Sequence, residues 1–252
     1  MKKKIIIPRE IEEISKKIIR YNTTIVLLCL VGIAIIDVIK RISYGPYNIT
    51  TYNPIDFFTI IVLILLLYYG NRLFNHALLL IWPEKSKTYK KLQQYGDPQL
   101  LLEDLNRSLN NQQNSFKLPW GTITEEYIVI PTPTCIYIAP IKELLWSFMA
   151  FRVNTGRYNS WKGRRSQYLL KFCFSTTETI KDVVVNKNLA AGALDYIKKV
   201  NPNVLIGFTD ELLHKCNTNF DEFKRQILTN VEALQETTSA KEIATMVDGF
   251  YR

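Results

Sequence analysis

Histidine and paired-cysteine motifs are almost absent from this sequence. It has two histidines, His76 and His214, and four cysteines, none of them spaced as C-x-x-C. A zinc site needs three or four such ligands close together, and a disulfide framework needs cysteines at dense, regular spacing. The scarcity argues against a metal protein and against a disulfide-stapled secreted domain. It favours a reducing compartment, and we expect no cofactor.

The sequence also lacks the short motifs of the common enzyme classes. It has no G-x-S-x-G, no phosphate-binding glycine-rich loop and no H-E-x-x-H. Glu125 and Glu126 are adjacent, and neighbours in a strand point to opposite faces, so they are not expected to act as a carboxylate pair. His214 is predicted to face solvent in the middle of a helix. These absences predict a protein that is not an enzyme.

What the sequence has instead is two long apolar runs near its N-terminus, residues 24–39 and 55–82. A helix that crosses the hydrocarbon needs roughly 20 mostly apolar residues. Neither run alternates with a polar face, as a helix of a soluble protein does. The runs predict a transmembrane hairpin over residues 23–82, with the second span at 55–74 and its last turns at the headgroups. The alternative is a buried helical hairpin of a soluble protein.

Lysine and arginine predict the orientation of this hairpin. The tail 1–22 carries seven cations and the linker 83–96 carries four, whereas the loop between the runs carries only Lys40 and Arg41. Both termini are therefore predicted in the cytoplasm, with the protein in the cell membrane and the lipid bilayer as a partner. Residues 5–20 place isoleucines at helical spacing, which predicts an amphipathic helix on the membrane or an extension of the first span.

Three ionisable residues fall within the apolar runs. Asp37 lies near the outer end of the first run, and Arg72 and His76 lie near the inner end of the second. Ionisable residues inside a span are candidates for function. Each of these lies close to an end, where a long side chain reaches the interface, and we expect that simpler role.

Residues 97–252 are long enough for one domain with its own core. Asp97-Pro98 is a typical helix start, and from residue 116 the spacing of apolar residues changes from helical to strand-like. Strands are predicted at 117–122, 127–130, 135–139, 144–153, 167–175 and 179–185. Helices are predicted at 189–200, after Thr209, at 220–234 and at 240–247. The predicted fold class is α+β: a transmembrane helical hairpin followed by an antiparallel β-barrel or sandwich with flanking helices.

Three segments of this domain carry a resemblance to a known family. They are residues 95–98 (YGDP), residues 141–146 (IKELLW), and Asn201-Pro202 followed by residues 206–212 (IGFTDEL). Through them, residues 93–225 resemble a family of uncharacterised two-span bacterial membrane proteins with a pleckstrin-homology-like cytoplasmic domain. The resemblance implies that fold. It implies no activity, because the fold serves lipid binding, peptide binding and scaffolding alike.

The basic charge of the domain is concentrated in one stretch without acids. Residues 144–177 contribute +6 to the net charge of +9. Cations that bind phosphate, beside aromatics that insert at an interface, suit a surface for lipid headgroups. The candidate lipid- or anion-binding residues are Arg152, Arg157, Tyr158, Trp161, Lys162, Arg164 and Arg165, and Lys171 completes the stretch. The alternatives are a solvated hairpin tip, whose cations pair with acids elsewhere, and a surface for nucleic acid, which a membrane tether disfavours.

Three hypotheses for the function follow. The first is a membrane-tethered, non-enzymatic binding or scaffolding module that contacts anionic lipid headgroups. The second is an accessory subunit of a membrane transport complex, in which the hairpin packs against another membrane protein. The third is an enzyme of unrecognised type. Vesicle binding would favour the first, and a membrane protein that co-purifies would favour the second.

Overall fold

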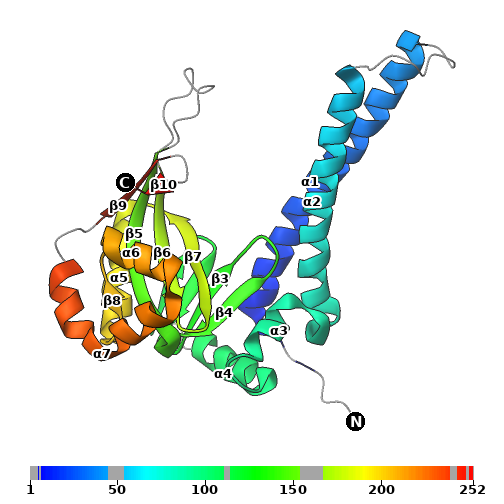
Figure 1. Ribbon diagram of the computed structural model, residues 1–252. Helices are drawn as coiled ribbons and strands as arrows, with labels where there is room; N and C mark the ends of the chain where they lie inside the picture. Colours follow the sequence, from blue (N-terminus) through cyan, green and yellow to red (C-terminus); the bar gives the residue numbers. More distant parts are fainter. Residues whose placement is uncertain are drawn as a thin grey trace. The chain divides into compact units, whose positions relative to one another are not determined.

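The computed structural model describes residues 5, 7–44, 54–110, 114–153, 167–238, 243–247 and 250–251 (Figure 1). The chain is mixed α+β and divides into two compact units. The hairpin unit comprises Met1–Gln93, Asp97–Leu102 and Pro131–Ile136, and the sheet unit comprises Gln94–Gly96, Glu103–Ile130 and Tyr137–Arg252.

Two long helices, α1 (Arg9–Tyr44) and α2 (Pro54–Ile81), make up most of the hairpin unit. Both are long and apolar enough to cross a membrane, over Arg9–Ile39 and Phe57–Ile81. Their apolar windows are 6% and 0% buried within the protein, unlike the core helix of a soluble protein. Helix α1 starts well before the apolar run, so residues 9–20 extend the first span, which is one of the two predicted outcomes.

Helix α1 packs along α2 (Figure 1). The buried side chains of α1 recur at spacings of four and three residues. They are Ile11, Ser15, Ile18, Asn22 and Cys29. This spacing keeps one stripe of a helix against its neighbour. In α2, the buried residues Asn75, His76 and Leu79 lie near its C-terminal end, so the first half of α1 and the last turns of α2 are the parts of the hairpin that the protein itself buries.

The linker after α2 is largely helical. It contains the turn η1 (Pro83–Lys85) and the short helix α3 (Lys87–Leu92), whose first turn is capped by the Ser86 side chain accepting from Tyr89 N at 3.1 Å. Helix α4 (Pro98–Asn110) begins as predicted, with Asp97 Oδ1 accepting from Gln99 N at 2.9 Å.

The first sheet has the strand order β1-β2-β3-β4. Its strands are β1 (Ser115–Leu118), β2 (Gly121–Thr124), β3 (Tyr127–Pro131) and β4 (Ile136–Pro140). The single strand predicted at 117–122 is wrong, because Pro119 and Trp120 form a turn between two antiparallel strands. Proline donates no ladder hydrogen bond, which ends β1 at Leu118.

The second sheet is mixed and is built around β5. Its strands are β5 (Leu144–Val153, preceded by the turn η3, Ile141–Glu143), β6 (Gln167–Phe174), β7 (Thr177–Val185), β8 (Leu205–Ile206), β9 (Ile243–Val247) and β10 (Phe250–Tyr251). Strands β6 and β7 follow β5 antiparallel, whereas β8 and β9 pair with β5 in parallel. The helix predicted at 240–247 is wrong, because pairing with β5 favours a strand in this β-branched run.

The described strands form two sheets and no closed barrel. Three helices complete the unit: α5 (Lys187–Val200), α6 (Asp210–Thr218) and α7 (Phe220–Thr238). Two of them start at the predicted caps. Leu212 N donates to Thr209 Oγ1 at 3.2 Å, and Glu222 N donates to Asn219 Oδ1 at 3.3 Å. Glu222 Oε2 also accepts from the side-chain Nδ2 of Asn219 at 2.9 Å, whereas a capping box would use the backbone N–H.

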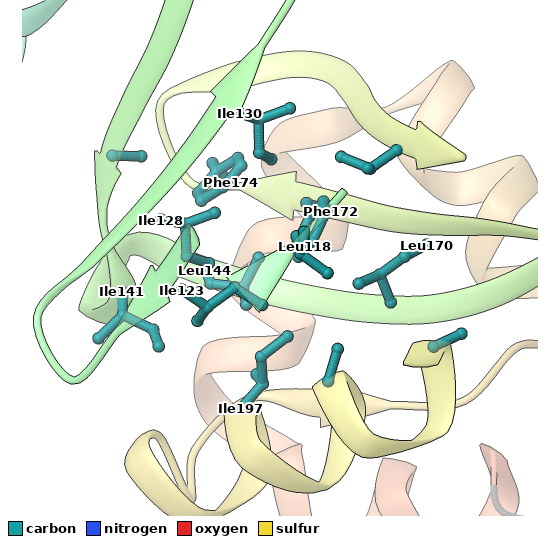
Figure 2. Close-up of a cluster of buried hydrophobic side chains, with 14 of the residues drawn as sticks. Leu118, Ile123, Ile128, Ile130, Ile141, Leu144, Leu170, Phe172, Phe174 and Ile197 are labelled. Carbon is teal, nitrogen blue, oxygen red and sulfur yellow. The ribbon is translucent and has the colours of Figure 1, made fainter. Parts of the chain in front are cut away.

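Two hydrophobic clusters cover the two faces of the second sheet. Figure 2 shows the first, where side chains of the first sheet and of α5, such as Ile128 and Ile197, meet Leu170 and Phe172 of β6. The second joins β5 and β6 to α6 and α7 and contains Trp146. Successive side chains of β6 alternate between the two clusters, because neighbouring residues of a strand point to opposite faces of the sheet. The β5–β6 hairpin is therefore held from both sides.

Candidate lipid-facing site

The basic stretch of the sequence lies at one end of the β5–β6 hairpin. The two strands pair from Leu144↔Phe174 to Arg152↔Gln167. The segment that follows, residues 154–166, connects the strands at that end and is named the basic loop here. Six of the seven candidate residues are in it and lie outside the described residues: Arg157, Tyr158, Trp161, Lys162, Arg164 and Arg165.

The strands that carry the basic loop are firmly fixed. Trp146 Nε1 donates to Gly207 O at 2.6 Å, and Ser147 Oγ donates to Lys171 O at 2.8 Å. Both side chains are fully buried. Near the loop, the rings of Phe151 and Tyr168 pack with their centroids 4.9 Å apart. The loop thus starts from a rigid base.

Arg152 is the one candidate residue that the structure describes. It pairs with Gln167 of β6 on one side and with Met246 of β9 on the other, at the last position of the β5–β6 ladder. Its side chain is half-buried, and no carboxylate among the described residues forms an ion pair with it. Arg152 therefore places a cation, without an ion pair to a described carboxylate, at the foot of the basic loop.

Lys171 differs from the other cations of the stretch. Its side chain is only 7% exposed, and Nζ lies 3.0 Å from Asp182 Oδ2, directly across the β6–β7 ladder. A buried ammonium paired in this way is not available to an external anion. The sixth cation of the acid-free stretch is thus structural.

A polar cleft of about 330 Å³ lies elsewhere in the sheet unit. It is lined by Asp104, Arg107, Ser108, Asn114, Glu125 and Glu126. Glu125 and Glu126 form the turn between β2 and β3 and both line the cleft, so the expectation that they point apart is wrong. Because Arg107 pairs with Asp104, the lining is acidic and does not suit a phosphate.

The sequence did not predict that two pairs of polar side chains are buried, one in each unit. Cys173 Sγ and Cys216 Sγ lie 3.6 Å apart, and the hydrogen bond between the thiols and burial raise the pKa of Cys173. No spacing rule links positions 43 residues apart. In the hairpin unit, Asn22 and His76 are fully buried, so His76 is enclosed by the protein instead of reaching the interface as the sequence led us to expect. The polar side-chain atoms of Asn22 have no hydrogen-bond partner among the described residues. The heptad-like spacing of α1 could have shown that Asn22 faces the seam. His214 is exposed, as predicted.

Comparison of the chain with models of protein families, with curated proteins and with solved structures finds no match.

Proposed function

We propose that the protein is a membrane-tethered, non-enzymatic binding or scaffolding module, whose basic loop contacts anionic lipid headgroups. In this proposal both termini are cytoplasmic, and the sheet unit is a pleckstrin-homology-like domain. The observation that carries the proposal is the acid-free basic loop at the rigid end of the β5–β6 hairpin, in a chain with two candidate membrane spans.

The exposed surface of the two long helices supports a membrane. Leu28 of α1 is 65% exposed and Leu67 of α2 is 72% exposed. Large apolar side chains exposed in rows along both helices are costly in water, at about 25 cal/mol per Å² of apolar surface. A bilayer removes that cost and holds the rest of the chain within reach of its headgroups.

The charge of the basic loop supports an anionic surface. With Arg152 it brings five cations together without an intervening acid. Each Lys or Arg near an anionic leaflet gains about 1 kcal/mol. Tyr158 and Trp161 are the side-chain types that settle at a membrane interface. The acidic cleft offers no competing site for a phosphate.

Hydrogen exchange of the full-length chain in lipid nanodiscs tests the proposal. One disc type contains phosphatidylglycerol and the other only phosphatidylcholine. We expect amides of residues 154–166 to exchange more slowly in the anionic discs. High salt should remove the difference, because the Debye length falls from about 10 Å at 0.1 M to about 3 Å at 1 M.

Two variants with the same change of net charge make the test specific. The first replaces Arg157, Lys162, Arg164 and Arg165 by Ser. The control replaces four exposed cations outside the loop by Ser: Lys142, Lys187, Lys199 and Arg225. Only the first should abolish the protection. Equal exchange of the wild-type loop in both disc types would refute the proposal and direct attention to a protein partner.

A further inference from the structure

Arg72 is the deepest cation at the inner end of the hairpin. It lies 18 residues after Pro54, the first residue of α2, which is about 27 Å along the helix at 1.5 Å per residue. The hydrocarbon of a bilayer is about 30 Å thick. No charged residue stands between Asp56 and Arg72. If α2 crosses a bilayer, the guanidinium of Arg72 therefore lies at the level of the lipid phosphates.

The structure holds this guanidinium in place. Arg72 Nε donates to Pro133 O at 3.1 Å, from the segment Pro131–Ile136 of the same hairpin unit. That segment is itself anchored, because Ile136 N donates to Thr88 Oγ1 at 3.0 Å. A freely snorkelling arginine has no such fixed backbone partner. The side chain is thus pre-oriented, which lowers the entropy lost when it binds a ligand.

Two aromatic rings lie beside the guanidinium. Arg72 Cζ is 5.8 Å from the ring centroid of Tyr68 and 5.9 Å from that of Tyr69. Tyr68 is 50% exposed, so its hydroxyl can also meet a ligand. No carboxylate among the described residues forms an ion pair with Arg72. Four of its five N–H groups remain for a ligand once Nε has donated to Pro133.

We propose that Arg72, with Tyr68 and Tyr69, binds the phosphate of a membrane lipid at the end of the span. A planar guanidinium donates two parallel hydrogen bonds to phosphate oxygens, a geometry that lysine does not offer. The site recognises the phosphodiester rather than net headgroup charge, so zwitterionic and anionic phospholipids both fit. It goes beyond the function of the basic loop, and shares with it only the premise that α2 spans a bilayer.

Native mass spectrometry of the full-length chain tests this site. The protein is released from detergent micelles after titration with phosphatidylcholine, a zwitterionic phosphodiester, or with diacylglycerol of the same acyl chains. The wild-type chain should bind its first phosphatidylcholine on the order of tenfold more tightly than diacylglycerol, as a charge-assisted bidentate pair implies. Because the comparison uses wild-type protein, it does not depend on how a variant folds. Equal affinities would overturn the proposal.

Variants then locate the site. Arg72→Gln should lose the preference for phosphate, and Arg72→Lys should keep only part of it. Lys85→Gln is the matched control, because Lys85 carries the same charge at the same end of α2 and stacks on Trp82 at 5.1 Å. It should leave the preference intact. If the four-residue Ser variant of the basic loop abolishes the preference and Arg72→Gln does not, the loop binds the lipid and the Arg72 site is wrong.

Discussion

Replacing Gly121 by Ala should destabilise the sheet unit strongly. Gly121 starts β2, and a Cβ atom built on it would lie 2.3 Å from the carbonyl oxygen of Val129 in β3. The obstacle is backbone, so no rotamer relieves it. The two strands would have to separate by roughly 1 Å to restore a normal contact. That movement acts on the neighbouring pairs Thr122↔Val129 and Ile123↔Ile128.

The size of the effect follows from three terms. Overpacking a well-packed site costs about 1–3 kcal/mol, and a weakened ladder hydrogen bond adds about 1 kcal/mol. The lower entropy of alanine in the unfolded chain returns about 0.4–1 kcal/mol. The net loss is about 1–3.5 kcal/mol. For a unit of this size, 1 kcal/mol corresponds to roughly 2–4 °C, so the Tm should fall by roughly 2–14 °C.

Thermal unfolding of the full-length chain in detergent measures this change, with Trp146 in the second core cluster as a fluorescent reporter. Gly192→Ala is the matched control in α5. There the new Cβ meets only the ring of Phe116, at 3.3 Å and 3.4 Å, and alanine in a helix interior gains about 0.5–1 kcal/mol. Its Tm should stay close to wild type or rise. A Tm for Gly121→Ala equal to that of Gly192→Ala would refute the reasoning.

Three further predictions concern titration, charge and oxidation. Burial raises the pKa of Tyr127 to about 12. The contribution of this tyrosine to the free energy of unfolding should therefore be fully present below about pH 10 and decrease as the pH rises toward 12. Thermal unfolding of Tyr127→Phe at alkaline pH should lack this decrease. Asp182→Asn should lower the free energy of unfolding more than Lys171→Met does, because it leaves a buried ammonium unpaired. Denaturant titrations should show a difference of about 1–2 kcal/mol between the two variants. Equal losses would contradict the ion pair. Diamide, which accepts two hydrogen atoms, should join Cys173 and Cys216 in a disulfide, and peptide mapping without reduction should find this pair and no other.

Much of the fold could be predicted from local patterns. Strand β5 has the predicted bounds, and the caps at Thr209 and Asn219 start the helices that they were expected to start. These features depend on residues close together in the sequence. Such features can therefore be predicted without knowledge of distant contacts.

The errors arose where a distant partner decides the local structure. Residues 243–247 are a strand because β5 offers a parallel edge, and Gly121 is required by the carbonyl of Val129. The ion pair that removes Lys171 from the basic surface depends on the β6–β7 register. The charge of the basic loop could be read from the sequence, but which cations the sheet neutralises could not.

The buried polar residues Asn22 and His76 lie at the same level of the hairpin, which bears on the proposed membrane boundary. Asn22 lies 22 residues before the end of α1 at Tyr44, and His76 lies 22 residues after the start of α2 at Pro54. In an antiparallel pair with equal rise per residue, both therefore reach the same level of the seam. An unpaired buried polar group costs about 1–3 kcal/mol even in a protein interior, and more in lipid. The polar seam at this level, one turn beyond Arg72, supports the proposal that this part of the hairpin lies outside the hydrocarbon, which the lipid-phosphate site at Arg72 also requires.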